Sequence, residues 1–260
     1  MALTNQSFTK KLEDSTSNPQ KTSLRIALLH GLLSGGGAKR LLYELAARLK
    51  ARGHSMDVFH INDCDDIYLS LEPMATNRFV YYYEKKYLIP WSGFIRKQFR
   101  TLYRPLMLLE NFLDLRRFDK LCKDIAKDID ENNYDLVLAN PFTNFQSPNT
   151  LRYLKTPSVY LCLETLRGTT EFLPQKKQVI PWLKRQVGKF RRFEHLNMLL
   201  RRRNDERNVK AATTVLTNSY FSRESLYRWY RRDAGVLKHG VNSDLFYPLN
   251  LERENLVLSV

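Results

Sequence analysis

The sequence has few cysteines and no long apolar run. Its three cysteines, Cys64, Cys122 and Cys162, are far apart and odd in number, which argues against a disulfide framework or a CxxC metal site. No window approaches the roughly 18 to 20 apolar residues of a membrane-spanning helix. Residues 1–23 are polar and lack the apolar core of a signal peptide. We therefore expect a cytoplasmic protein with a flexible tail at 1–23 and at most a peripheral membrane contact.

Acidic residues are scarce relative to basic ones. The chain has 42 Lys and Arg against 27 Asp and Glu, a net charge of +15. Such an excess favours phosphate-rich partners, namely anionic lipid headgroups, nucleotides or nucleic acid, and charge alone does not choose among them. The five histidines have no zinc-binding spacing, so we expect no bound metal.

The N-terminal third has the pattern of a βαβ unit. Residues 24–30 are a short apolar run typical of a buried strand, and the glycines Gly35, Gly36 and Gly37 follow it. Apolar residues then recur at helical spacing from 38 to 49, and Gly53 is placed as a C-terminal cap. Residues 55–61 read as a second strand. The glycine turn thus exposes backbone N–H groups at a helix N-terminus, where a phosphate binds favourably.

Three later segments, 134–139, 158–163 and 213–217, repeat the short apolar pattern and end in polar residues. Strands that alternate with helical stretches predict an α/β fold with a doubly wound, mainly parallel Rossmann-like sheet. Residues 255–260 begin another apolar strand. We therefore expect one Rossmann-like domain at 24–248 and, at 249–260, the start of a second domain that is truncated here.

Two basic insertions separate these strands. The first, 95–113, has apolar residues at steps of three and four, with a kink expected at Pro105. The second, 176–210, carries 12 Lys and Arg against 3 acids. A solvated helix face is the usual explanation, but aromatic residues among the cations favour an anionic membrane surface. The candidate contacts are Arg96, Lys97, Arg100, Lys184, Arg185, Arg201, Arg202 and Arg203.

Several segments together resemble family 4 glycosyltransferases of the GT-B fold. The run Gly35-Gly-Gly-Ala-Lys-Arg40 resembles the GGA-[E/K]-R opening of that family, and residues 49–58, with Gly53 and His54, resemble its second strand. Residues 134–139 are similar to its YDLV strand, and Val215 to Phe221 to its NS-x-F strand. Lys238 to Pro248 resembles the segment that leads into the second domain. The matches occur in family order over nearly the whole chain after the tail.

This resemblance implies a retaining, nucleotide-sugar-dependent glycosyltransferase of the hexosyltransferase type. The chain would be its N-terminal, acceptor-binding domain, with basic helical insertions. In the family the glycine loop reaches the donor diphosphate, and the second domain binds the nucleotide. We therefore expect Gly35, Gly36 and Gly37 to form the donor diphosphate loop, no cofactor other than the donor substrate, and an isolated chain that is inactive. A lipid-linked or membrane glycan as acceptor fits the basic helices.

Four further residues are candidates for the acceptor side. The run Leu161 to Arg167 resembles a C-H-E-P-x-R variant of the family, which places Glu164 as the catalytic residue and Arg167 as a phosphate partner. The histidine of that motif is replaced by Leu163. Asn140 and His30 each end a predicted strand, and we expect both to line the acceptor cleft.

Two other functions remain open from the residues alone. A non-enzymatic Rossmann-like module would bind anionic lipid or nucleic acid through the basic helices, although we expect no nucleic acid partner. A dinucleotide-dependent oxidoreductase fits less well, because the glycines do not have the G-x-G-x-x-G spacing. A second Rossmann-like half with an E-x7-E pair after residue 260 would decide for the transferase.

Overall fold

The computed structural model describes residues 23–31, 36–62, 69–86, 100–142, 146–166, 181–243 and 246–248, and positions 255 and 257. The strands are β1 (Arg25–Gly31), β2 (Ser55–Ile61), β3 (Asn77–Tyr81), β4 (Leu136–Phe142), β5 (Ser158–Leu161), β6 (Thr214–Thr217) and β7 (Gly235–Val236). The α-helices are α2 (Gly37–Ala51), α4 (Arg100–Glu131), α6 (Pro181–Ala211) and α7 (Tyr220–Tyr230), and the short 3-10 helices are η2 (Glu72–Met74) and η3 (Asn149–Arg152).

The seven strands form one parallel sheet in the order β3-β2-β1-β4-β5-β6-β7. This confirms the predicted doubly wound α/β fold. The chain leaves β1 toward β2 on one side and later returns to β4 on the other, so the strand order reverses between β1 and β4. In open α/β sheets ligands bind at the carboxyl ends of the strands at such a switch point.

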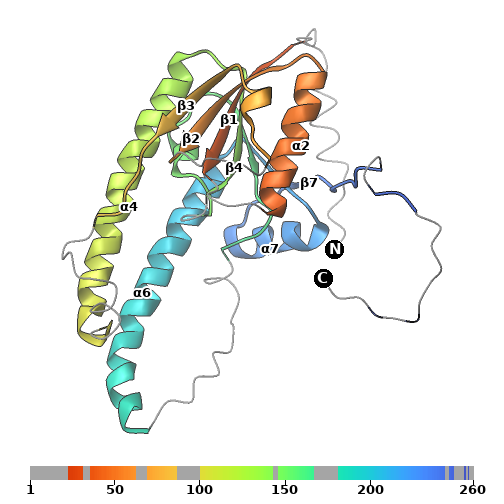
Figure 1. Cartoon of the computed structure of the whole chain (residues 1–260). Coiled ribbons are helices and arrows are strands. Elements are labelled where there is room, and N and C mark those ends of the chain that lie inside the picture. The colour runs from red at the N-terminus through yellow and green to blue at the C-terminus, as the bar shows by residue number, and fades with distance from the viewer. Residues whose placement is uncertain are drawn as a thin grey trace.

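Helices cover both faces of the sheet (Figure 1). On one face, alternate residues of β1 such as Ile26 and Leu28 pack against Leu42 and Ala46 of α2. On the other face, the remaining β1 residues join a larger core with α4, α6 and α7. Because successive strand residues point to opposite faces, each position on a strand can be assigned to the α2 face or the α4 face.

The close approach of β1 and β4 depends on a glycine. A Cβ added at Gly31 would lie 2.5 Å from Cδ1 of Phe142, so any larger residue would displace that ring. The register between the two strands is also irregular between Leu29 and Gly31. The switch point is therefore built around a strand end that requires glycine.

The structure extends the predicted pattern in three places. β3 and β7 were not predicted, since β3 is a sheet edge that begins with two exposed polar residues and β7 has only two residues. The helix of the first insertion begins at Arg100 and continues to Glu131 as one element through Pro105. The tail at 1–23 and the strand predicted at 255–260 lie outside the described residues, apart from Ser23, Asn255 and Val257.

Candidate functional site

The glycine turn ends at a helix N-terminus whose N-cap residue is a glycine. Gly36 is the N-cap residue of α2, with φ +150°, and as a glycine it has no side chain to cap the first turn. The first turn contains no acid. A Cβ added at Gly36 or Gly37 would meet no heavy atom within 4 Å, so the space in front of both residues is open. Gly35 lies outside the described residues. The turn therefore offers backbone donors and room for a negatively charged group.

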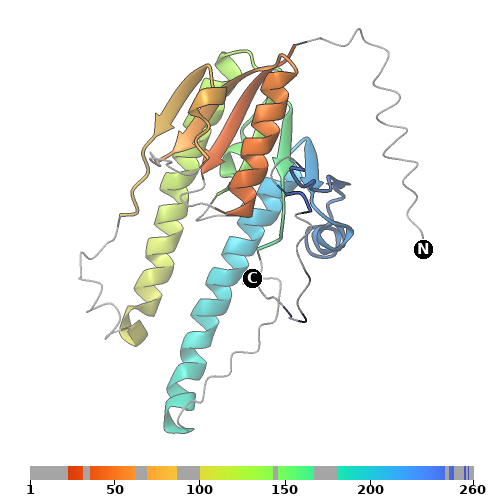
Figure 2. The same ribbon diagram turned by 45° about the vertical axis from the view of Figure 1, so that its right-hand side comes forward.

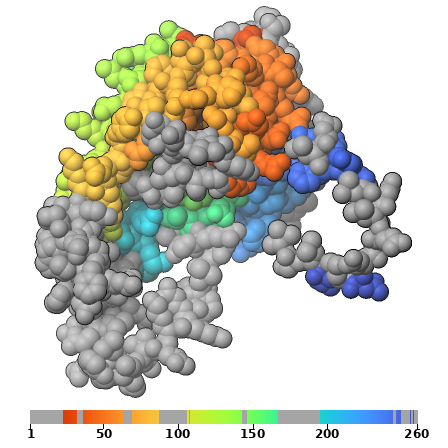
Figure 3. Space-filling view, in the orientation of Figure 1, coloured from red at the N-terminus to blue at the C-terminus, as the bar shows by residue number. Residues whose placement is uncertain are grey.

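A pocket of about 630 Å³ adjoins this turn. One wall is the outer side of α2, with Gly37, Arg40 and Arg48, and the other is the segment after β7, with Lys238 and residues 239–242. In Figure 3 the orange surface of α2 adjoins the dark blue surface of that segment. The Arg40 guanidinium lies 5.6 Å from the ring centroid of Phe246, which joins the two walls. Three cations, one acid and a helix N-terminus thus meet in one pocket, where Glu44 lies 3.8 Å from Arg48.

Polar residues end the α2 face of three neighbouring strands. His30 on β1, His60 on β2 and Asn140 on β4 lie two residues after Leu28, Val58 and Leu138, so strand alternation places all three on that face. All three are buried, and the rings of His30 and His60 meet edge to face with centroids 5.5 Å apart.

The first turn of α2 adds a buried cation. Lys39 is buried and lies on the same side of α2 as Leu42 and Ala46, which pack on the sheet. The sheet-facing side of the helix therefore begins with Lys39. We predicted His30 and Asn140 as site residues but missed Lys39 and His60. Two patterns in the sequence could have identified them. Lys39 lies three residues before Leu42, on the sheet-facing side of the helix, and His60 ends the second strand as His30 ends the first.

Asn140 is the most unusual member of this cluster. Its side chain is 0% exposed, and among the residues that the structure describes neither its Oδ1 nor its Nδ2 has a hydrogen-bond partner. A buried amide without partners costs free energy, and native structures retain few of them. Such a residue at a topological switch point is a candidate ligand contact.

Glu164 follows β5 at the same edge of the sheet. Its side chain is exposed, and its backbone oxygen accepts hydrogen bonds from Gln146 Nε2 at 3.1 Å and from the Cys162 thiol at 3.4 Å. Because β5 is two strands from β1, Glu164 is displaced from the β1 end by about 10 Å across the sheet. Arg167 lies outside the described residues. The structure thus places Glu164 at the predicted edge of the sheet, but two strands away from the strand that leads into the glycine turn.

A buried polar network holds the Glu164 loop. Asp205 of α6 accepts hydrogen bonds from the backbone N–H of Ser147 at 3.0 Å, from the Ser147 hydroxyl and from the hydroxyl of Tyr230. The Tyr230 oxygen in turn accepts from the N–H of Leu166 at 3.2 Å. Burial raises the pKa of Asp205 above its ordinary value, and the hydrogen bonds only partly offset this. The network fixes α6, α7 and the loop to one another.

The described cysteines are poor nucleophiles. Burial raises the pKa of Cys122 to about 12, and it also raises the pKa of Cys162 well above the ordinary thiol value. Because the thiolate is the reactive form, neither residue is suited to covalent catalysis near neutral pH. Within the described ranges no three His, Cys, Asp or Glu side chains come together as a possible metal site.

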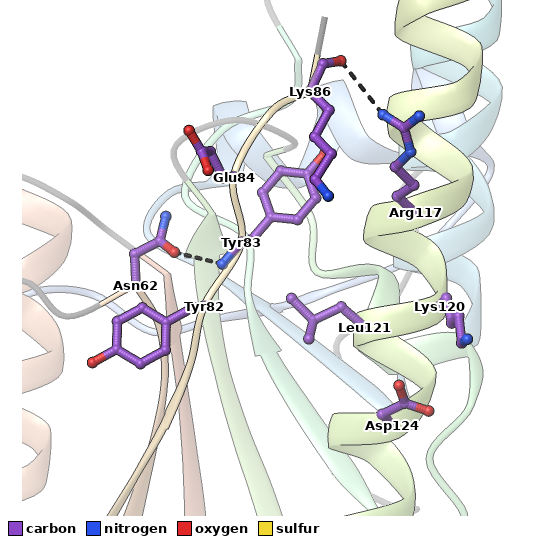
Figure 4. A pocket seen from close by; sticks show the side chains of 9 residues that line it. All are labelled: Asn62, Tyr82, Tyr83, Glu84, Lys86, Arg117, Lys120, Leu121 and Asp124. Atoms are coloured by element: carbon purple, nitrogen blue, oxygen red, sulfur yellow. Dashed lines mark hydrogen bonds between the residues drawn. The ribbon is translucent and has the colours of Figure 1, made fainter.

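A second pocket, of about 700 Å³, lies on the α4 face beyond β2 and β3 (Figure 4). Asn62, with φ +60°, accepts a hydrogen bond from the N–H of Tyr83 at 2.7 Å and so fixes the segment after β3. Arg117 of α4 donates to the backbone oxygen of Lys86 across the opening. None of the predicted site residues lines this pocket.

The basic candidates are divided between the two long helices. Arg201 and Arg203 are exposed on α6, whereas Arg202 lies over the indole ring of Trp229 at 4.9 Å and so packs on α7. Backbone positions 100, 184 and 185 belong to α4 and α6. Arg96 and Lys97 lie outside the described residues. No helix in the described part of the chain combines the length and apolar content needed to cross a bilayer.

The sequence matches no protein-family model and no curated protein. Solved structures with a similar chain path include Anabaena HepE in complex with UDP and glucose, with a TM-score of 0.45 and 16% identity over 85% of this chain and 46% of that one. A glycosyltransferase from Rickettsia africae has a TM-score of 0.43 and 17% identity over 88% and 46%. Arabidopsis thaliana UGT89C1 with UDP-L-rhamnose has a TM-score of 0.42 and 11% identity over 84% and 51%.

The chain therefore spans about half the length of these solved structures. Because their TM-scores lie below 0.5, the fold assignment rests on the strand order and the pairing of this chain itself.

Proposed function

We propose that the chain is the acceptor-side domain of a retaining, nucleotide-sugar-dependent glycosyltransferase. One observation carries the proposal. The two segments with the most specific resemblance to that family, Gly35 to Arg40 and Lys238 to Pro248, are about 200 residues apart in sequence but line the same pocket. A fold that brings these motifs together at the end of the sheet fits the family pattern better than two chance matches would.

The chemistry of this pocket suits a diphosphate. A donor diphosphate is an anion with several acceptor oxygens, and the α2 N-terminus, whose N-cap residue is a glycine, would present backbone donors to it. Arg40 and Lys238 would add two cations on opposite walls. The open space at Gly36 and Gly37 allows the phosphate to approach the backbone directly. In this proposal the nucleotide is held by a second domain, and the isolated chain is inactive.

The carboxyl edge of the sheet would hold the acceptor. Asn140 would donate to and accept from a hydroxyl of a glycan, which satisfies both of its amide atoms. His30 lies beside it, and Glu164 would orient the attacking hydroxyl from the β5 end. Arg167 would pair with a phosphate. The acceptor in this proposal is a glycan, either free or lipid-linked.

The alternative is a binding module without catalysis. It is favoured by the net charge of +15 and by the long basic helix α6. The two functions differ at the glycine turn, because a module that acts only through its basic helices has no need of an open helix N-terminus.

The test uses inorganic pyrophosphate as the probe of the turn. In a ¹⁵N-¹H NMR titration of the chain, we expect pyrophosphate to shift the amide signals of Gly36, Gly37 and the rest of the first turn. The variant Gly37→Ala should bind at least about tenfold more weakly, because its methyl group occupies the open space. Its fold should be retained, since Ala is favoured over Gly within a helix.

Two arginines on the same helix provide the matched control. Arg40→Gln should weaken pyrophosphate binding, whereas Arg52→Gln, at the C-cap of α2, outside the pocket and with the same charge change, should leave it nearly unchanged. If both Arg→Gln variants lose the same amount of pyrophosphate affinity, the effect comes from net charge alone. If pyrophosphate shifts no amide signal of the first turn, the turn does not bind a diphosphate.

A further inference from the structure

Two helices are much longer than the sheet they cover. α4 has 32 residues and α6 has 31, which gives each a length of roughly 47 Å. The longest strands have 7 residues and span only about 23 Å. Both helices must therefore extend well beyond the sheet.

The parallel topology decides the direction of this overhang. Each helix precedes a strand of the parallel sheet and runs opposite to the strands, so its N-terminus lies at the carboxyl edge. α4 first joins the core at Phe118, and α6 joins it at Val209. Figures 1 and 2 both show the preceding turns of the two helices projecting side by side from that edge. We call residues 100–117 and 181–203 the arm.

Charge is distributed unevenly along these helices. The first ten residues of α4 contain Arg100 and Arg104 and no acid, whereas its seven acids all lie from Glu110 onward. In α6, residues 181–203 contain eight Lys and Arg and a single acid, Glu194. The free end of the arm is therefore strongly positive. Both helix dipoles also place their positive ends there, which adds to the attraction for anions.

The arm also exposes apolar side chains. Leu109 is 49% exposed and Phe112 38% on α4, and Leu196 is 45% exposed and Met198 41% on α6. Leu109 and Phe112, three residues apart, share one side of α4, whereas Leu196 and Met198, two residues apart, point to different sides of α6. Exposed apolar side chains on helices with a cationic end are a feature of helices that lie at a membrane interface. Trp182, the second residue of α6, adds a residue type that is enriched at membrane interfaces.

We propose that the arm docks this domain on an anionic lipid bilayer, with the carboxyl edge of the sheet facing the membrane. Lysine and arginine would contact lipid headgroups, and the apolar side chains would enter the interface. Exposed leucine and methionine favour a bilayer over nucleic acid, which is bound mainly through phosphate contacts and aromatic stacking. If the proposed transferase function also holds, on which this last step rests, the acceptor is a lipid-anchored glycan presented by the same membrane.

The first experiment compares vesicle binding of two charge-reversed variants. Lys184→Glu with Arg185→Glu alters the free end of the arm, and Lys123→Glu with Lys127→Glu makes the same charge change on the exposed surface of α4 beside the sheet. Flotation with vesicles of 70% phosphatidylcholine and 30% phosphatidylglycerol should show at least about a 30-fold loss for the arm variant. The matched variant should lose far less. Circular dichroism would verify that both variants are folded.

The second experiment locates the contact. The chain has three tryptophans, so Trp91→Phe with Trp229→Phe leaves only Trp182, and Trp91→Phe with Trp182→Phe leaves only Trp229 beside the sheet. Brominated lipid should quench the fluorescence of Trp182 and leave that of Trp229 nearly unchanged. Quenching of both to the same extent would overturn the proposed orientation.

Three other results would overturn the membrane-docking proposal. If the unaltered chain does not bind the anionic vesicles, or if both charge variants lose binding equally, the arm is not a membrane-docking element. If short duplex RNA binds more tightly than the vesicles and only the arm variant loses it, the surface is a nucleic-acid site instead. Neither vesicle experiment requires a sugar donor. A failure of vesicle binding therefore does not affect the pyrophosphate test of the proposed function, and a failure of pyrophosphate binding does not affect the membrane proposal.

Discussion

Replacement of Asn140 by leucine should make the protein more stable and less able to bind its ligand. Leucine has a similar branched shape and no polar atom. An unsatisfied buried amide costs about 1–3 kcal/mol, and both amide atoms of Asn140 have no hydrogen-bond partner in the described part of the chain. Leu28, Leu138 and Leu161 lie on the same face, so the new side chain meets an apolar cluster on one side and His30 on the other. We therefore expect the free energy of unfolding to rise by about 1–2 kcal/mol.

The assay is urea unfolding monitored by circular dichroism, with Asn208→Leu as the matched control. Asn208 is also 0% exposed, but its Nδ2 donates to the backbone oxygen of Ser147 at 3.0 Å and to Asn149 Oδ1 at 2.7 Å. Its replacement removes both bonds and leaves the Ser147 oxygen without this donor, whereas Asn149 Oδ1 still accepts from Asn204 Nδ2 at 2.8 Å. The free energy of unfolding should therefore fall by about 1–3 kcal/mol. The two substitutions are chemically identical and should change stability in opposite directions.

The functional readout of Asn140→Leu is turnover by the complete enzyme. We expect a loss of turnover with the glycan acceptor together with the gain in stability, the trade-off typical of binding-site residues. A loss of stability comparable to that of Asn208→Leu would refute the reasoning, because it would mean that Asn140 is held by bonds within the fold. Higher stability with unchanged turnover would leave Asn140 outside the site.

Two further predictions concern buried carboxyl groups. Asp205→Ala should destabilise the fold by about 2–4 kcal/mol, because Ser147 N and the Tyr230 hydroxyl lose their acceptor. Burial raises the folded pKa of Asp205, so the wild type should gain stability relative to Asp205→Asn as the pH falls through that pKa toward about 4. Asp57 should show the opposite sign. Burial alone would raise its pKa, but hydrogen bonds from Tyr134, Arg25 and Asn77 outweigh this and lower it. The advantage of the wild type over Asp57→Asn, about 2–3 kcal/mol above pH 4, should therefore disappear as the pH falls through the folded pKa, and urea unfolding from pH 3 to 7 would test both signs.

The central part of the fold could be predicted because its strands are fully buried. Residues 24–30 and 55–61 were predicted as strands from their apolar content, and the structure has β1 at Arg25–Gly31 and β2 at Ser55–Ile61. Gly53, predicted as a helix cap, has φ +85°, and its N–H donates to Lys50. β3 escaped prediction because its register is imposed by β2, through Asn77 on Asp57, and not by its own polar and half-exposed residues.

The site was less predictable than the fold, since it depends on which segments meet. Asn140 and His30 could be placed at strand ends from sequence alone. The burial of His60 and Lys39 beside them follows from the α2 packing register, which the apolar pattern of residues 38–49 only implies. Arg202 was grouped with Arg201 and Arg203, yet its position over Trp229 depends on how α7 returns to the sheet. Such contacts are tertiary and leave no local sequence signal.

The parallel sheet explains why these features share one edge. Every strand ends there, so the polar ends of β1, β2 and β4 gather on one side of the molecule. Every helix that precedes a strand starts there, so the open N-terminus of α2 and the positive ends of α4 and α6 point the same way. A helix extended at its N-terminus must therefore project past the ligand edge and cannot project past the opposite one. If the arm lies on a membrane, the same topology directs the glycine turn and Asn140 toward that membrane, and a lipid-anchored acceptor would approach the site without leaving the bilayer.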